Sequence, residues 1–187
     1  MRYLRKSEID PLAISMCGLK LGQRVLVVGA SDPGLIAGLA AKVGLTGRAC
    51  MIGESEALTT AAAAAVEKEG ALVESFTAPL GALPFDGDAF DVAVMRNTLP
   101  AIDAARRAAA MREILRVVRP GGRCIAVDDL PRGGLRGLLG GRTVAGPSPG
   151  ALAVETLTAA GFRAVRLLAE REGFAFVEGI KAVSHSD

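Results

Sequence analysis

Apolar residues along the chain form short continuous runs that alternate with segments of helical spacing. Continuous runs predict strands covered on both faces, because such strands leave no position for a polar side chain. The clearest continuous run lies at residues 24–30, and further strands are predicted at residues 48–54, 71–78, 91–97 and 123–129. Helical spacing predicts helices at residues 11–19, 34–44, 55–70, 101–118 and 151–161. The alternation of strands and helices predicts an α/β fold with a doubly wound, mostly parallel sheet.

Local signals mark several boundaries of these elements. Ser55 is expected to cap the third helix, and Gly70 is expected to end it. Residues 119–122 (RPGG) predict a tight turn into the fifth strand. The helix at residues 101–118 is expected to bury one face, made of Ile102, Ala105, Ala109, Ile114 and Val117.

The last part of the chain has the pattern of a hairpin. Two apolar runs at residues 162–171 and 174–183 are joined by Glu172 and Gly173, which predicts an antiparallel hairpin at the sheet edge. With this hairpin the sheet has seven strands. Helices on both of its faces predict three layers.

The chain is expected to form a single domain over residues 1–187. Residues 1–20 predict an N-terminal helical segment, and residues 131–150 predict a loop rich in Gly and Pro. This loop is either a flap that orders over a substrate or a contact surface. In the second interpretation Leu135, Leu138 and Leu139, which stand between arginines, meet a partner or a membrane surface.

The composition of the sequence excludes several classes of protein. Half of the 187 residues are hydrophobic and the formal net charge is +2, so neither disorder nor nucleic-acid binding is expected. Cys17, Cys50 and Cys124 lie too far apart for a CxxC motif, so we expect buried thiols and no metal. Neither a secretory signal nor an apolar segment of about 18 residues is found, so we expect a cytoplasmic protein without a membrane span. The sequence indicates no oligomeric state.

The first strand ends in a turn typical of a nucleotide-binding loop, residues 25–34 (VLVVGASDPG). Asp32 is expected to cap the next helix, with Pro33 at its first position. Ala30 and Ser31 are small enough for a ligand to approach the backbone. The loop also resembles that of the NAD(P)-binding short-chain dehydrogenases, but its glycine spacing differs, and the only tyrosine, Tyr3, lies outside the predicted core.

A longer pattern in the second half resembles a known family. Leu83-Pro84-Phe85, Phe90-Asp91 and residues 119–122 have the order and spacing found in class I S-adenosylmethionine (SAM) dependent methyltransferases, in the branch that methylates quinones and other small molecules. The resemblance implies a Rossmann-like fold. Phe85 and Phe90 are expected to pack beneath the carboxyl ends of the sheet, and Asp91 to cap a neighbouring loop.

The resemblance also implies where the cofactor SAM lies, in the crevice beyond the carboxyl ends of the first four strands. Cofactor contacts are implied in the loops that follow these strands, at Gly29, Ala30, Ser31, Gly34, Glu54, Ser55, Ala78, Pro79, Leu80 and Arg96.

The sequence departs from the family where acids hold the cofactor. Val27 replaces an acid near the end of the first strand, Gly53 replaces the acid that binds the ribose, and Pro79 stands at or near the acid that binds adenine. Each lost charged hydrogen bond costs about 1.5–3 kcal/mol. We expect Glu54 to turn toward the ribose and backbone groups beside Pro79 to meet the adenine edge.

No catalytic residue is assigned from the sequence. The only histidine, His185, lies among the last residues, and the segment after the fourth strand has none. Asp128 or Asp129, at the end of the fifth strand, is a candidate general base. Two hypotheses remain: SAM-dependent methyl transfer to a small molecule, or a methyltransferase-like protein without catalysis that serves in binding or assembly, with a protein partner.

Overall fold

A computed structural model describes residues 11–131 and 147–183 of the chain. The strands are β1 (Arg24–Val28), β2 (Arg48–Gly53), β3 (Glu74–Thr77), β4 (Phe90–Arg96), β5 (Val118–Asp129), β6 (Arg163–Arg171) and β7 (Phe174–Ile180). The helices are α1 (Pro11–Met16), α2 (Pro33–Val43), α3 (Glu56–Lys68), α4 (Ala104–Val117) and α5 (Pro149–Ala159).

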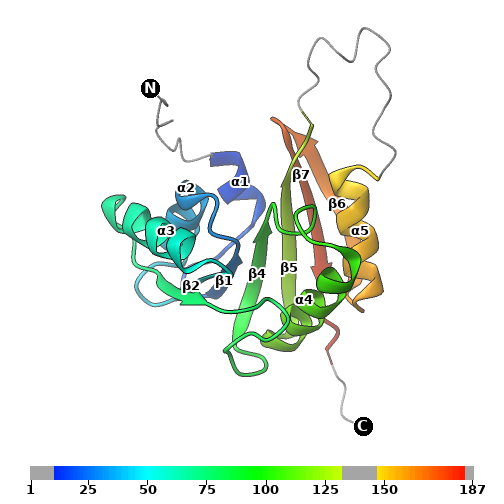
Figure 1. Cartoon of the computed structure of the whole chain (residues 1–187), viewed down its shortest axis with the longest axis horizontal. Coiled ribbons are helices and arrows are strands. Elements are labelled where there is room, and N and C mark those ends of the chain that lie inside the picture. The colour runs from blue at the N-terminus through cyan, green and yellow to red at the C-terminus, as the bar shows by residue number, and fades with distance from the viewer. Residues whose placement is uncertain (1–10, 132–146, 184–187) are drawn as a thin grey trace, which may run out of the picture.

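All seven strands lie in one sheet with the order β3-β2-β1-β4-β5-β7-β6 (Figure 1). Strands β1 to β5 run parallel, whereas β7 runs antiparallel to both β5 and β6. The predicted α/β fold, with a mostly parallel sheet and an antiparallel C-terminal hairpin, is therefore confirmed. The strand order reverses between β1 and β4, which is where sheets of this kind bind ligands.

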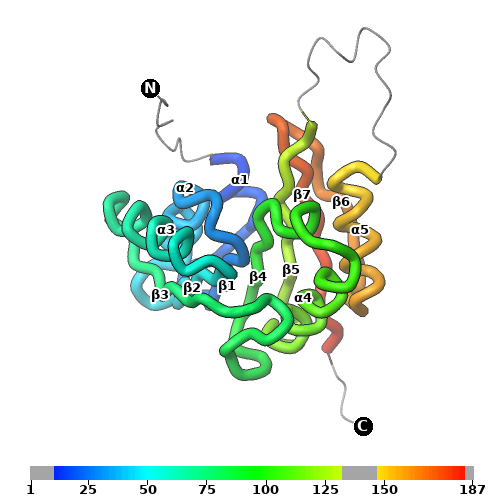
Figure 2. Tube along the Cα trace, viewed as in Figure 1, coloured from blue at the N-terminus to red at the C-terminus, as the bar shows by residue number. Residues whose placement is uncertain are grey.

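Helices cover both faces of the sheet and form the outer layers (Figure 2). Helices α1, α2 and α3 pack on one face, where Leu39 of α2, Val66 of α3 and Val94 of β4 belong to one cluster of buried residues. Helices α4 and α5 pack on the other, where Ile114 of α4 and Leu157 of α5 lie in one cluster. Small residues along α2 bring that helix close to the sheet.

Asp91 ties together the amino ends of three strands. Its carboxylate accepts a hydrogen bond from the backbone N–H of Arg24 at 2.7 Å and another from Nε of Arg119 at 2.5 Å. These two bonds connect β4 to the first residue of β1 and to β5. Asp91 thus joins backbone and side-chain groups at the edge of the sheet opposite the expected cofactor loops.

The expected position of the two phenylalanines is wrong for Phe90. This residue begins β4, so it lies at the amino edge of the sheet rather than beneath the carboxyl ends. Its ring meets that of Phe85 edge to face, with centroids 5.0 Å apart, and the ring of Phe85 meets that of Phe76 at 4.8 Å. The two aromatic residues of the motif therefore pack the loop between β3 and β4 against the sheet.

The predicted RPGG turn lies inside β5 and interrupts its pairing with β4. Val118 pairs with Phe90 and Arg123 with Val92, so the residues between Val118 and Arg123 bulge out of the ladder. Gly121 has φ +73°, a conformation that glycine adopts readily.

Two further predictions need correction. The buried face of α4 holds Ala110, Met111, Ile114 and Val117, whereas Ala105 is exposed. Helix α5 begins at Pro149, inside the predicted loop at 131–150, with Ser148 as its cap.

Some predictions lie outside the described residues, namely those on residues 1–10, on the leucines between 132 and 146, and on His185. Among the helices of residues 11–131 and 147–183, none has the length and apolar character required to cross a membrane.

Candidate functional site

A cavity of about 270 Å³ lies at the carboxyl edge of the sheet, beside the point where the strand order reverses. The segments that follow β1, β2, β3 and β4 supply its walls, together with the start of α3. Of the residues predicted to bind the cofactor, those that line the cavity are Gly29, Ala30, Ser31, Glu54, Ser55, Leu80 and Arg96.

Three of the predicted residues do not line this cavity. Gly34 is buried in the first turn of α2, and Pro79 is exposed. The backbone N–H of Ala78 donates a hydrogen bond to the carbonyl oxygen of Gly53 at 3.1 Å, so it serves the connection between β2 and β3. Cofactor contacts at all of these positions stay predictions.

The cavity also has an apolar wall that sequence reasoning missed. It includes Leu58 of α3, Ala101 and Ile102, in addition to Leu80. Leu58 is 64% exposed, an unusual exposure for a leucine beside a cavity. No local signal marks Leu58, because a leucine early in an amphipathic helix is typical of core packing. The wall suits a flat, weakly polar group.

Two glycines of the cavity are required by contacts within the chain. Gly29 has φ +105°, and a Cβ there would lie 2.9 Å from the carbonyl oxygen of Arg96. A Cβ on Gly53 would lie 2.8 Å from Oγ1 of Thr59. Both glycines therefore allow the strand-end loops to approach neighbouring segments, and this approach brings the walls of the cavity together.

Glu54, the acid next to the family's ribose position, is held at both carboxylate oxygens. Oε1 accepts a hydrogen bond from the backbone N–H of Leu80 at 3.3 Å. Oε2 accepts one from Nη2 of Arg106, on α4, and forms an ion pair with it. The Arg106 bond fixes Glu54 at the cavity wall, and each oxygen retains acceptor capacity for a further donor. Nothing in the sequence pattern predicts this contact between α4 and the β2 loop.

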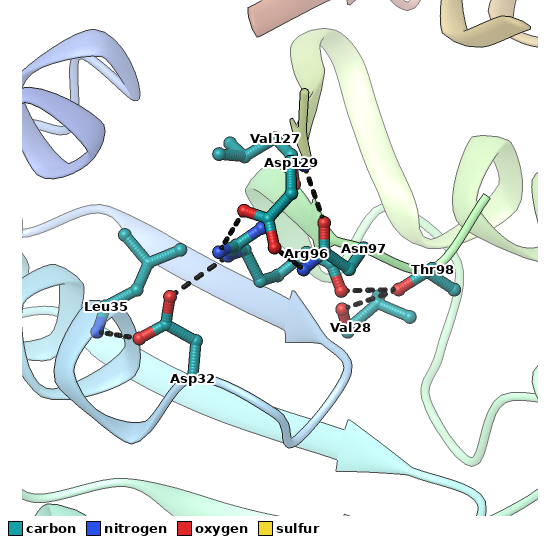
Figure 3. A network of polar contacts seen from close by, with 8 residues as sticks. All are labelled: Val28, Asp32, Leu35, Arg96, Asn97, Thr98, Val127 and Asp129. Atoms are coloured by element: carbon teal, nitrogen blue, oxygen red, sulfur yellow. Dashed lines mark hydrogen bonds and ion pairs between the residues drawn. The ribbon is translucent and has the colours of Figure 1, made fainter. Parts of the chain in front are cut away.

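Arg96 carries the most connected side chain of the site (Figure 3). Its Nε donates to Oδ2 of Asp32 at 3.0 Å, and its Nη2 donates to Oδ1 of Asp129 at 2.8 Å. Nη1 lies 3.4 Å from the carbonyl oxygen of Val127, and the guanidinium stands over the ring of Phe174, 5.1 Å from its centroid. The side chain thus joins the segment after β1, the end of β4 and the end of β5.

Asp32 has two functions in this network. Its Oδ1 accepts the backbone N–H of Leu35 at 3.0 Å, which is the helix cap predicted from the sequence. Its Oδ2 accepts the hydrogen bond from Nε of Arg96. The hydroxyl of Thr98 donates to the carbonyl oxygen of Val28 at 3.0 Å, so the segment after β4 also bonds to the end of β1 (Figure 3).

Asp128, one of the two candidate bases, is buried and does not line the cavity. It pairs with Ala175 of β7, and a Cβ on Gly150 would lie 3.5 Å from that of Ala175, so the side chain of Asp128 faces α5. Within the described residues neither of its carboxylate oxygens has a hydrogen-bond partner. Burial raises the pKa of Asp128 to about 7, although the charge of Arg96 opposes the change.

The three cysteines are buried and free. Burial raises the pKa of Cys50 to about 11 and that of Cys17 and of Cys124 to about 12. They are therefore protonated at neutral pH and packed as small apolar residues. In the part of the chain that the structure describes, no group of three His, Cys, Asp or Glu residues is placed to hold a metal ion.

Comparison with known proteins identifies the family. Residues 25–122, just over half of the chain, match the family described as a methyltransferase domain. The chain belongs to this methyltransferase family. The matched residues run from β1 to the bulge of β5, and they include all the residues that line the cavity. The class I resemblance of the sequence is therefore confirmed at the level of the family. No curated protein sequence matches the chain.

Solved structures share the fold of this methyltransferase domain over almost all of its length. A SAM-dependent methyltransferase from Aquifex aeolicus is 22% identical, with a TM-score of 0.72 and coverage of 93% of this chain and 95% of that one. The cyclase SpnF is 20% identical, with a TM-score of 0.68 over 92% and 79% of the two chains. A putative methyltransferase of Haloferax volcanii, in complex with its activator Trm112, is 15% identical, with a TM-score of 0.63 over 94% and 89%.

The residues of the cavity fit the nucleoside half of SAM, the cofactor that the family implies. The apolar wall at Leu58, Leu80 and Ile102 suits a base, and the Glu54 carboxylate supplies acceptors for ribose hydroxyls. Small residues at the end of β1 leave backbone groups accessible.

Proposed function

We propose that this methyltransferase domain binds SAM in the cavity at the carboxyl ends of β1 to β4 and transfers its methyl group to a small molecule. The observation that carries the proposal is that the loops of four strands meet there, in a chain whose family is that of methyltransferase domains. Ligands of open α/β sheets bind at such a point.

Bound SAM supplies a methyl group already activated on a sulfonium. The chain then has to bind and orient the cofactor and the acceptor and to exclude water, since proximity supplies most of the rate in such a transfer. We assign the ribose hydroxyls to Glu54, whose carboxylate Arg106 orients. We assign the base to the wall made by Leu58, Leu80 and Ile102.

Neither candidate base is assigned a proton-transfer step. The carboxylate of Asp129 is bound by Arg96 and Asn97, and Asp128 does not line the cavity. The resemblance to the quinone and small-molecule branch implies a small-molecule acceptor.

The alternative function is that of a methyltransferase-like binding or assembly protein. Val27 and Gly53 at two positions where the family has acids favour it, because each missing charged hydrogen bond lowers cofactor affinity. One structural neighbour, a putative methyltransferase, forms a complex with an activator protein, which supports a protein partner. A protein partner therefore remains the second candidate.

Thermal unfolding with added ligand separates the two functions. SAM or S-adenosylhomocysteine at a hundred times its dissociation constant should stabilise the fold by about 2.7 kcal/mol. NAD serves as a control nucleotide and should leave the unfolding midpoint unchanged. No change of the midpoint with millimolar SAM would overturn the proposed function and favour the alternative.

A further inference from the structure

Three leucines at one corner of the molecule face the solvent. Leu21 is 74% exposed, Leu45 is 91% exposed and Leu72 is 75% exposed. Leu21 precedes β1, Leu45 precedes β2 and Leu72 precedes β3, so all three lie at the amino edge of the sheet, opposite the cavity. We call these three residues the leucine corner. A group of exposed large apolar side chains marks an interaction site more often than a single one does.

Contacts within the chain show that the leucine corner is one continuous surface. A Cβ on Gly44 would lie 2.6 Å from Cδ1 of Leu21, so the side chain of Leu21 packs against the turn that carries Leu45. Leu45 and Leu72 together line two grooves, of about 360 and 260 Å³, which also share Gly44 in their walls. The three leucines therefore stand around one depression and are not scattered over the surface.

Small residues leave this depression open. The groove of about 360 Å³ lies between α2, which lines it with Ala37, Gly38 and Ala41, and the turn after α3, which lines it with Gly70 and Ala71. Residues of this size leave space for a larger side chain from outside, and an unfilled space forfeits packing contacts. The corner thus carries projecting leucines beside hollows that leucines of another molecule can enter.

The charges around the leucine corner are of both signs. Lys42 lies in the last turn of α2, Lys68 ends α3, and Glu69 follows it. Beside them Arg48 and Glu74 bind each other through two hydrogen bonds, of 2.8 and 2.7 Å. A nucleic acid or an anionic membrane binds surfaces of predominantly positive charge, which this rim does not present. The rim suits a protein surface that also carries both signs.

We propose that the leucine corner is the contact between two copies of this chain, related by a twofold axis. Such an axis places the same surface on both sides, so the leucines of one copy meet the hollows of the other. Glu69 of one copy can then reach Lys42 or Lys68 of the other. A second copy supplies the apolar projections, the hollows and the mixed rim at once. The dimer goes beyond the proposed function, because each copy keeps its own cavity at the opposite edge of the sheet.

The size of the leucine corner sets the strength of the expected dimer. Leucines exposed to this degree present on the order of 400 Å² of apolar surface per copy, the size of patches that mark interaction sites on soluble proteins. A standard interface buries about 800 Å² from each partner, so the corner with its rim lies at the lower end of the range. We therefore expect a reversible dimer with a dissociation constant on the order of 10 µM.

Sedimentation equilibrium of the full chain tests the proposal, at concentrations from about 1 to 300 µM that lie on both sides of this constant. Leu45→Glu and Leu72→Glu each place a carboxylate in the apolar contact. Because both leucines are exposed, the fold should be retained, and thermal unfolding at the lowest concentration checks this. The matched control is Leu167→Glu, which makes the same substitution at a leucine that is 47% exposed on β6, the opposite edge strand.

The unmodified chain and Leu167→Glu should dimerise with constants that agree within twofold. Either corner variant should raise the dissociation constant by about a hundredfold or more, because the twofold axis brings two unpaired carboxylates into the contact. The inference is wrong if the unmodified chain remains a monomer at the highest concentration. It is also wrong if both corner variants dimerise as tightly as the unmodified chain. Neither result affects the proposed function, which depends on the cavity at the other edge.

Discussion

Asn97 and Asp129 hold each other through two reciprocal hydrogen bonds. Nδ2 of Asn97 donates to Oδ2 of Asp129 at 2.9 Å, and the backbone N–H of Asp129 donates to Oδ1 of Asn97 at 2.8 Å. Asn97 directly follows β4 and has φ +50°, a conformation that asparagine tolerates better than most residues. The pair therefore fixes the segment after β4 to the end of β5 and presents Asp129 to Arg96.

Two substitutions of Asn97 should separate the stability that comes from its hydrogen bonds from the strain of its positive φ. Asn97→Ala loses both bonds and places a β-carbon at positive φ, so we expect the free energy of unfolding to fall by about 2–3 kcal/mol. Asn97→Gly loses the same bonds without the conformational penalty and should cost about 1 kcal/mol less. Urea unfolding of both variants measures the difference, and equal losses would show that the positive φ of Asn97 stores no strain.

Gly29 should be much less tolerant of substitution than another glycine of similar conformation. A Cβ at Gly29 would lie 2.9 Å from the carbonyl oxygen of Arg96, whereas Gly70 has φ +77° and no atom within 4 Å of its Cβ position. We expect Gly70→Ala to cost about 1–2 kcal/mol from its backbone conformation alone. Gly29→Ala should cost a further 1–3 kcal/mol, roughly, from the clash. Similar losses in urea unfolding would contradict the close approach of the β1 and β4 loops.

The strands could be predicted from the sequence because a run of apolar, β-branched residues favours a buried strand whatever the rest of the chain does. The run at 24–30 is continuous and apolar, so its identity as β1 does not depend on the rest of the fold. The inner face of α4 was harder to assign, because alanines occur on every side of this helix. Periodicity then selected Ala105, which is exposed, instead of Ala110 and Met111.

The polar contacts of the site were beyond sequence reasoning for a different reason. Asp32 was predicted as a helix cap, and the cap is present, but its second oxygen binds Arg96 on a distant strand. Likewise the position of Glu54 indicated an acid near the ribose, while its bond to Arg106 depends on how α4 packs beside the β2 loop. Such contacts arise from tertiary packing, which no local pattern records.

Asp128 should make the stability of the fold depend on pH. Burial raises its pKa from the ordinary value of 3.8 to about 7, so between these values the folded chain holds a proton that the unfolded chain has released. The free energy of unfolding should therefore fall as pH rises from 4 to 7, by about 1.4 kcal/mol per unit from this group. Asp128→Asn removes this dependence, so the variant should gain stability relative to the unmodified chain as pH rises and keep that gain above pH 7.

Unfolding by urea at pH 5, 6, 7 and 8 measures this difference. Asp86→Asn is the control, because Asp86 is exposed and the substitution makes the same change in net charge. A difference between Asp128→Asn and the unmodified chain that does not vary with pH would contradict the burial of the Asp128 carboxyl group beneath α5.

Glu54 should contribute to the affinity for SAM through its charge. Glu54→Ala removes a charged acceptor and should weaken SAM binding by about tenfold or more, in line with the 1.5–3 kcal/mol of a charged hydrogen bond. Glu56→Ala is the matched control, since Glu56 is an exposed acid two residues later, in the first turn of α3. Calorimetric titration of SAM into both variants measures this contribution. An unchanged affinity for SAM in Glu54→Ala would show that Glu54 does not bind the ribose.

The most direct test of the central claim is a titration of the ¹⁵N-labelled chain with SAM, followed by the amide resonances. If SAM binds in the cavity between β1 and β4, the amides of Ala30, Ser31, Leu80 and Asn97 should shift together and saturate. The claim would be contradicted if millimolar SAM shifted none of these amides. It would also be contradicted if the shifts were confined to the groove of about 360 Å³ between α2 and the segment after α3, which is lined by Leu45 and Leu72.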